Sequence, residues 1–286
     1  MIELLIEPFT YQYMLKAIWV SALVGGVCAF LSCYLMLKGW SLMGDALAHS
    51  VVPGVALAYL VAAPYAVGAF ISGIIAALGM ALVRQKTRLR EDAIIGLVFT
   101  SFFAIGLLIV SINPTSVNVQ SIVLGNILGI SDEDVVQVAI IATVSLVILL
   151  ARWRDLMAAF FDENHARSIG LDPLRLKVLF FVLLSACTVA ALQTVGACLV
   201  IAMVVTPGAT AYLLTDRFGW LIVIAVVMGV LTSAVGAYVS YFLDGATGGL
   251  IVVFQTALFL IAFVFAPKYG RLAARRATAT LRASEQ

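Results

Sequence analysis

An acidic and an imidazole side chain lie four residues apart in a long apolar run of this chain. Asp45 and His49 stand in the string GWSLMGDALAHSVVPGV, and no other Asp, Glu, Lys or Arg lies between Lys38 and Arg84. A carboxylate at the centre of a bilayer costs at least about 2.5–3.5 kcal/mol on insertion scales, so it normally faces a wet pathway or a partner. A spacing of four places both side chains on one helix face, about 6 Å apart along the axis.

This pair could offer an oxygen and a nitrogen to the same ligand. Neutral imidazole and carboxylate suit divalent transition metals such as manganese, iron or zinc. Two ligands cannot complete a coordination sphere, so waters, backbone oxygens or a second subunit would supply the others. Because a transport site must also release its ion, an incomplete sphere fits transit better than storage. A purely structural role, in which Asp45 and His49 hydrogen-bond neighbouring helices, stays open at this point.

The elements that must position the pair follow from composition. The chain has 286 residues, of which 63% are hydrophobic and 11% charged, and its mean hydropathy is +1.12. A water-soluble domain of this size would need far more polar surface, so the composition indicates a polytopic membrane protein. The four cysteines form no CxxC pair and are interpreted as small packing residues.

Apolar stretches, cut at charges and at Pro/Gly positions, predict an all-α, polytopic transmembrane helical bundle of about nine spans. The predicted spans are 17–37, 42–62, 64–83, 93–112, 135–151, 176–193, 197–214, 219–242 and 248–266. An eight-span bundle with one re-entrant segment stays open. Residues 1–268 then form a single transmembrane domain, and 269–286 a basic cytoplasmic tail that we expect to be disordered.

Basic residues predict the orientation of the bundle. If the loop 84–90 is cytoplasmic, the amino terminus lies outside and the carboxyl terminus inside. Sixteen of the 17 basic residues then fall on the inner side, and Lys16 alone lies near the outer side. The chain is therefore expected to be a multi-pass membrane protein. It contains no GxxxxGK[ST] phosphate loop, so another chain must bind ATP if ATP drives it.

The segment RWRDLMAAFFDENHARSIGLDPLRLK, residues 152–177, is the longest polar interruption. Asp162-Glu163-Asn164 supplies N-cap residues, and Ala166 to Ile169 can form a short helix. Gly170 followed by Asp172-Pro173 ends this helix and begins the next span. This pattern predicts a short helix across the cytoplasmic mouth, with an ordinary long loop as the alternative. For His165, a packing or hydrogen-bonding role is favoured over metal binding.

Four other features carry expectations. The outer segment 113–131 is too polar for a span and too apolar for a free loop, so it either dips back to line a vestibule or lies as an interfacial helix. Pro207 predicts a helix kink that Thr206 and Thr210 could compensate. Asp244 is interpreted as a solvated turn acid, and the recurrent glycines of the spans as packing residues.

Six strings carry a resemblance to a known family. They are LKGWSLMGDALAHSVVPGVALAY, LREDAIIGLVF, NPTSVNVQSIVLGNILGI, FDENHARSIGLDPLRLK, TVGACLVIAMVVTPGATAYLLTDRF and LDGATGGLIVVFQT. The chain closely resembles the membrane permease of bacterial ABC importers for manganese, iron or zinc, most strongly the manganese and chelated-iron branch. The resemblance covers residues 4–268. It implies that residues 1–268 form a single transmembrane permease domain in the bacterial inner (cytoplasmic) membrane.

The resemblance implies a transport subunit without enzymatic activity or a permanently bound cofactor. It implies inward transport of manganese or ferrous iron, with zinc less favoured. The implied partners are membrane lipid, a second permease copy or a related permease, two cytoplasmic ATPase subunits and an extracytoplasmic metal-binding protein, but no nucleic acid. Asp45 and His49 match the family's Asp-x-x-x-His motif, which implies metal contact. The family's ATPase-coupling helix is matched by Asn164, His165, Ala166, Arg167, Ser168, Ile169, Gly170 and Leu171.

Two other classes of function remain as alternatives. The chain could be a proton-coupled secondary metal transporter with Asp45 as its protonation site, or a non-transporting membrane receptor or scaffold. Copurification of an ATPase would separate the importer from both.

Overall fold

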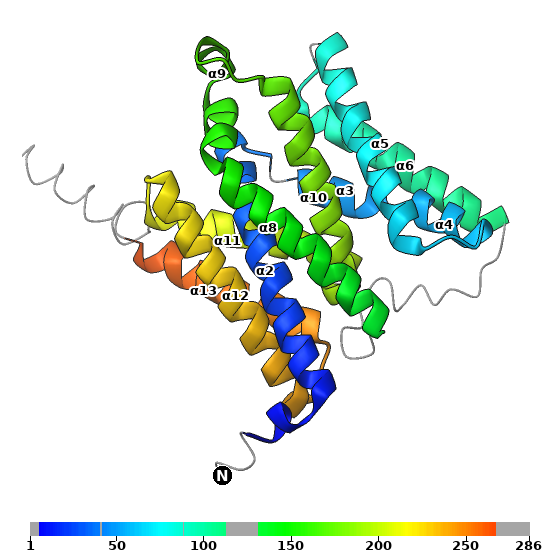
Figure 1. Ribbon diagram of the computed structural model, residues 1–286, viewed down its shortest axis with the longest axis vertical. Helices are drawn as coiled ribbons and strands as arrows, with labels where there is room; N and C mark the ends of the chain where they lie inside the picture. Colours follow the sequence, from blue (N-terminus) through cyan, green and yellow to red (C-terminus); the bar gives the residue numbers. More distant parts are fainter. Residues whose placement is uncertain (1–5, 41, 88, 113–130, 267–286) are drawn as a thin grey trace, which may run out of the picture.

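The computed structural model describes residues 6–40, 42–87, 89–112 and 131–266, and every regular element in these ranges is a helix (Figure 1). A short 3-10 helix, η1, precedes the first long α-helix. The elements are η1 (Glu7–Thr10), α2 (Gln12–Lys38), α3 (Met43–Ser50), α4 (Val52–Leu60), α5 (Tyr65–Lys86), α6 (Glu91–Ile112), α8 (Asp132–Phe161), α9 (Glu163–Ser168), α10 (Pro173–Val195), α11 (Ala197–Leu214), α12 (Phe218–Leu243) and α13 (Thr247–Phe265).

Within the described residues, eight helical segments are long and apolar enough to cross a membrane. All nine predicted spans are helical, but the seventh, 197–214, forms α11, whose fully described apolar part, Val200–Leu214, is shorter than the others. Each of the nine predicted spans thus has a helical counterpart, and eight segments of the described residues meet both the length and the hydropathy of a span, so the prediction of about nine spans, with eight possible, agrees with the structure. The all-α class is confirmed.

Helix α2 lies at the centre of the bundle and packs on α8, α10, α11 and α12 (Figure 1). Its contact with α12 is close because glycines face each other. A Cβ added to Gly25 would lie 2.7 Å from the carbonyl oxygen of Gly229, and one added to Gly229 would lie 2.5 Å from that of Gly25. The packing role expected for the span glycines is confirmed at this crossing.

Pro207 lies inside α11, as expected, and the neighbouring backbone is bonded from two helices. Ser32 of α2 donates its hydroxyl to the carbonyl of Val205 at 3.0 Å and accepts the backbone N–H of Gly208 at 2.9 Å. Thr210 donates to the carbonyl of Thr206 at 2.8 Å. The carbonyl that Pro207 cannot serve is that of Met203, so the compensating role of Thr206 and Thr210 stays a prediction, while the bonds from Ser32 were not anticipated.

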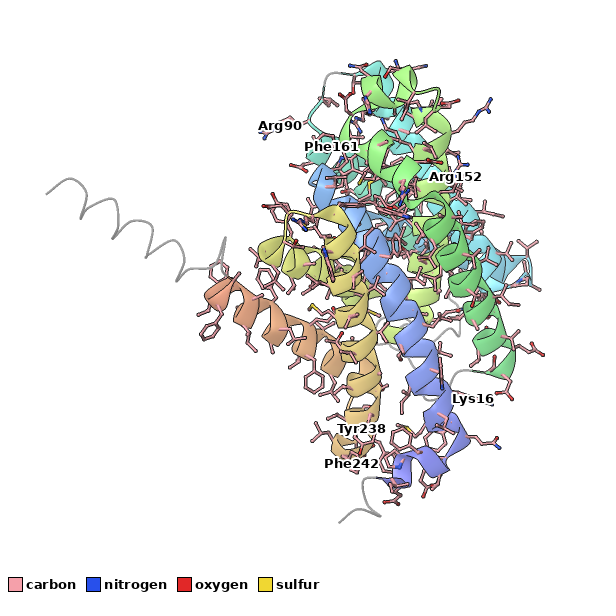
Figure 2. All side chains as sticks on the ribbon, turned by 60° about the vertical axis from the view of Figure 1, so that its left-hand side comes forward. Lys16, Arg90, Arg152, Phe161, Tyr238 and Phe242 are labelled. Atoms are coloured by element: carbon pink, nitrogen blue, oxygen red, sulfur yellow. The ribbon has the colours of Figure 1, made fainter. Side chains whose placement is uncertain are left out.

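Charged residues gather at the two ends of the bundle, with Lys16 near one end and Arg90 near the other (Figure 2). At the Lys16 end, Lys16 forms an ion pair with Asp132 of α8, and Phe9 stacks on Tyr238 with ring centroids 5.5 Å apart. Aromatic side chains at such a level are typical of a membrane–water interface. The separation of the charges agrees with the predicted sidedness, and which end faces the cytoplasm stays a prediction.

Two sequence-based expectations fall outside the described residues. These are the re-entrant or interfacial segment within 113–131, of which the structure describes only Ser131, and the tail 269–286. Asp244, by contrast, is described: it is exposed and ends α12 with a positive φ of 46°. This confirms its interpretation as a turn residue.

Candidate metal site

The predicted span 42–62 is not one continuous helix but two helices, α3 and α4, that meet at Val51. Pro53 explains the break because it has no N–H to donate to the carbonyl four residues earlier. The backbone at the break is bonded instead by Ser72 of α5, whose hydroxyl donates to the carbonyl of Ser50 at 2.6 Å. The Asp45/His49 pair therefore lies on a short helix of eight residues.

Asp45 and His49 point toward each other on α3. The Nε2 atom of His49 lies 3.3 Å from Oδ1 of Asp45, and their side chains are 23% and 34% exposed, respectively. Two ligands that each lie about 2.0–2.2 Å from one metal ion are separated by roughly 3.0–3.5 Å in tetrahedral or octahedral geometry. The N···O distance fits two ligands of the same ion, and it equally fits a direct ion pair or hydrogen bond between the two side chains.

Two aromatic rings of α6 pack against the imidazole. The ring centroids of Phe99 and Phe103 lie 5.3 and 5.5 Å from that of His49. Because these rings lie four residues apart on α6, they match the spacing of Asp45 and His49 on α3. The rings limit how far the imidazole can turn, while Asp45 is the more exposed ligand of the pair.

Among the side chains that the structure describes, no group of three or more His, Cys, Asp or Glu residues could hold a metal ion. Asp45 and His49 are thus two possible ligands outside any larger cluster of the described residues, and their role as metal ligands stays a prediction. Cys28, Cys33 and Cys187 are buried and free, in agreement with their interpretation as packing residues.

The expected short helix across one end of the bundle is α9. Asp162 caps it by accepting the backbone N–H groups of Asn164 at 2.8 Å and His165 at 3.2 Å. Gly170 ends it with a φ of +85°, a conformation that glycine adopts without a Cβ penalty. Asp172 then caps α10. The predicted caps are confirmed, although the helix begins at Glu163 rather than at Ala166.

The residues predicted for ATPase coupling lie along α9 and the turn after it. Ala166 is buried and accepts the N–H of Leu171 at 3.0 Å, which fixes the turn to the helix. Asn164, His165, Arg167, Ser168 and Ile169 are exposed. The segment is therefore held to the protein by its buried Ala166, and its other side chains are exposed.

Glu163, at the first position of α9, binds two lysines from other helices. Its Oε1 atom accepts a hydrogen bond from Lys177 of α10 and lies 3.9 Å from Nζ of Lys38, at the end of α2. Burial alone would raise the pKa of Glu163, but the bond from Lys177 and the charges of Lys177, Lys38 and Arg84 lower it. Glu163 thus ties α9 to α2 and α10 as a carboxylate.

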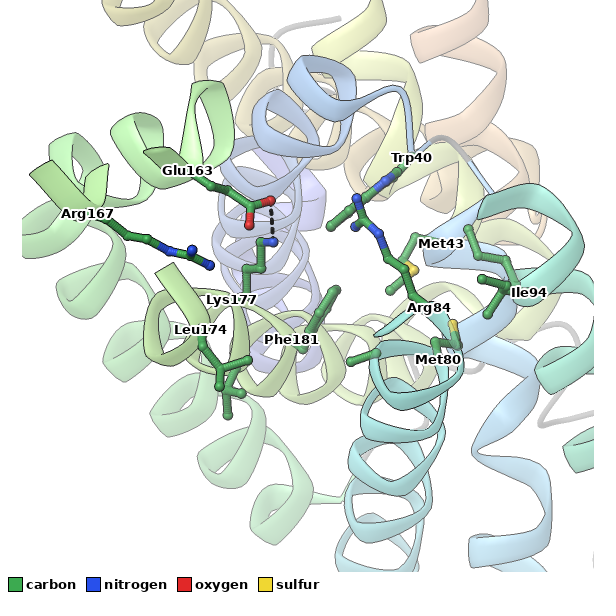
Figure 3. Close-up of a pocket in the computed structure, with 13 residues that line it drawn as sticks. Trp40, Met43, Met80, Arg84, Ile94, Glu163, Arg167, Leu174, Lys177 and Phe181 are labelled. Atoms are coloured by element: carbon green, nitrogen blue, oxygen red, sulfur yellow. Dashed lines mark hydrogen bonds and ion pairs between the residues drawn. The ribbon is translucent and has the colours of Figure 1, made fainter. Parts of the chain in front are cut away.

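The Asp45/His49 pair and α9 do not meet: a cavity of about 470 Å³ is lined by Met43 of α3 and by residues of α9, but not by Asp45 or His49 (Figure 3). Met43, in the first turn of α3, lies on one side of it, and Glu163 and Arg167 of α9 lie on another. Trp40 stands between them, with Arg84 over its ring at 5.3 Å.

Sequence reasoning missed the side chains that support these sites from other helices. Phe99, Phe103, Lys38, Lys177 and Trp40 are ordinary span or flank residues by type. Only the fold brings them to His49 and Glu163. A weak signal existed in LREDAIIGLVF, which contains Phe99 and was singled out without a role.

A bundle of apolar helices that carries an acid and an imidazole on a broken span defines a multi-pass membrane transport protein. A family model agrees: the chain belongs to the ABC 3 transport family, whose model matches residues 10–266. It is a permease subunit of the inner membrane and not an enzyme.

Similar proteins support this assignment along nearly the whole chain. The chain is 73% identical over 278 residues to the chelated iron transport system membrane protein YfeC of Yersinia pestis, covering 97% of this chain and 95% of that protein. It is 52% identical to the manganese transport system membrane protein MntB of Synechocystis, covering 94% and 88%. Among solved structures, PsaBC from Streptococcus pneumoniae in complex with Fab matches with a TM-score of 0.85 and 31% identity, covering 96% of this chain and 100% of that chain.

Proposed function

We propose that this chain is the permease of an ATP-driven importer that moves divalent manganese or ferrous iron into the cytoplasm. The observation that carries the proposal is the Asp45/His49 pair, whose Nε2 and Oδ1 atoms lie 3.3 Å apart on a partly exposed face of a broken span. The relatives named for chelated iron and manganese transport support this class of substrate. The metal is the cargo, and a second copy, waters or backbone oxygens would complete its coordination.

The energy source would be a separate ATPase docked on α9. The chain itself contains no phosphate loop. Large apolar side chains next to α9 are exposed, with Phe161 78%, Ile169 55% and Leu174 55% accessible. Apolar side chains grouped at a helix end, beside an exposed Arg167, are typical of a protein–protein contact. We assign this surface to the ATPase and the opposite end to an extracytoplasmic metal-binding protein.

Reconstitution tests the proposal. The permease, with its ATPase and binding protein, is placed in liposomes and supplied with radioactive manganese or ferrous iron. We expect uptake only when ATP reaches the ATPase side. Uptake driven by an imposed proton gradient without ATPase would favour the proton-coupled carrier instead, and absence of flux under both conditions would favour a scaffold.

A further inference from the structure

The cavity beside α9 has an excess of positive charge among its described lining residues. Arg84, Arg167 and Lys177 face it, against the single carboxylate of Glu163 (Figure 3). Lys38, which shares that carboxylate with Lys177, adds a further cation next to it.

These charges are partly removed from water. The side chains of Lys177 and Lys38 are only 17% and 20% exposed. Burying a charge is costly unless it is paired, and here two ammonium groups depend on one carboxylate oxygen. A further anion would therefore be favoured at this place.

The lowered pKa of the Glu163 carboxyl group indicates a positive electrostatic potential at this place. Glu163 has a lowered pKa although its burial acts in the opposite direction, because three cations surround it. A positive potential that outweighs desolvation of one anion also favours the binding of a second. It disfavours a metal cation, so the cavity differs in chemistry from the Asp45/His49 pair.

The rest of the wall is apolar. Met43, Met80, Ile94, Ile95, Leu174 and Phe181 line it below the charged groups. A volume of about 470 Å³ lies within the range of small-molecule sites, about 300–1,000 Å³. Cations at one side and an apolar wall at the other match an amphiphile with an anionic head better than a free anion.

We infer that this cavity binds the phosphate group of an anionic phospholipid, with the glycerol and upper acyl region against the apolar wall. Basic pockets between helices at the cytoplasmic side of a membrane protein are suited to such headgroups. The site lies outside the Asp45/His49 pair, and its occupation does not require that the chain transport metal. Bound lipid would add a contact between α9, α10 and α5.

Lipid binding to the purified full-length chain tests the inference. Native mass spectrometry in detergent would compare phosphatidylglycerol with phosphatidylcholine, and thermal unfolding would be followed with each lipid. We expect tighter retention and a higher unfolding midpoint with phosphatidylglycerol. Arg167→Gln, at an exposed position that the fold tolerates, should weaken its binding about fivefold, and Lys177→Gln at least as much.

The matched control is Arg175→Gln. Arg175 lies on α10 two residues from Lys177, pairs with Asp172 at 3.1 Å and is 88% exposed outside the cavity. Its substitution should leave lipid binding unchanged. Equal binding of both lipids, or equal loss in all three variants, would overturn the inference. Displacement of the lipid by millimolar inorganic phosphate would also overturn the lipid assignment and point to a soluble phosphate ligand.

Discussion

The metal pair on α3 and the charged cluster at α9 are built in opposite ways. Asp45 and His49 lie on an eight-residue helix that is interrupted at Val51, and both side chains are partly open. The α9 segment is held by Asp162 at its start and by Glu163, which joins it to two other helices. The two regions thus differ in how other helices hold their charged side chains: Glu163 is bound by Lys38 of α2 and Lys177 of α10, whereas Asp45 and His49 pair with each other within α3.

The largest effect is expected from removing the ligands. Asp45→Asn and His49→Gln keep the size of each side chain but remove the charge or the imidazole. Because a two-ligand site has no spare donor, we expect ATP-dependent uptake of manganese or ferrous iron to fall about 10–100-fold, the range found for weakened metal sites. Uptake into liposomes measures it.

Asp244→Asn is the matched control for Asp45→Asn, because Asp244 is an exposed acid at a helix end far along the chain. It should transport normally. Normal uptake in both Asp45→Asn and His49→Gln would show that the pair is structural.

A smaller effect is expected where α4, the helix that follows the Asp45/His49 helix, packs against α5. A Cβ at Gly54 of α4 would lie 2.0 Å from the carbonyl oxygen of Gly68 in α5 and 2.6 Å from Cβ of Ser72. Gly54→Ala should therefore push α4 away from α5 and lower the free energy of unfolding by about 1–3 kcal/mol. Thermal unfolding in detergent measures the change.

Gly79→Ala serves as the control on α5, since no heavy atom lies within 4 Å of an added Cβ. It should be neutral or stabilising by up to about 1 kcal/mol, because alanine favours a helix over glycine. Equal destabilisation by both changes would mean that the close contact at Gly54 carries no special weight.

The smallest effect is expected at Glu163, which links α9 to α2 and α10. Glu163→Gln leaves Lys38 and Lys177 without their shared carboxylate, at a cost of about 1–2 kcal/mol, between the values for exposed and buried pairs. The pKa of Glu163 is lowered, so its contribution is complete above the unfolded pKa of about 4.3 and is lost as the pH falls through the folded value.

Unfolding midpoints of wild type and Glu163→Gln between pH 7 and pH 3 check this prediction. The two should differ at neutral pH and converge in acid. A difference that stayed constant over this range would argue against an ionic role for Glu163.

Features that depend on residues close together in the sequence could be predicted, and those that depend on contacts between distant residues could not. Hydropathy located the helices, and the short-range signals at Asp162, Gly170 and Asp172 gave the caps of α9 and α10 correctly, because caps depend on neighbours two or three residues away. The break in span 42–62 was not predicted, although Pro53 was visible, because a proline can begin a helix as well as interrupt one.

The surroundings of the candidate site required the fold. His49 and Phe99 are 50 positions apart, and Glu163 and Lys38 are 125 apart, so no spacing rule connects them.

The close crossing of α2 and α12 at Gly25 and Gly229 has a consequence for how the protein is made. The two glycines are 204 positions apart in the sequence. At roughly 5–20 residues per second, synthesis of the second begins about 10–40 s after the first. During that interval α2 exposes to lipid, or to an insertion factor, the small-residue surface that it later buries against α12. Helix α2, at the centre of the finished bundle, is thus made early and remains without its α12 contact until α12 has been synthesised.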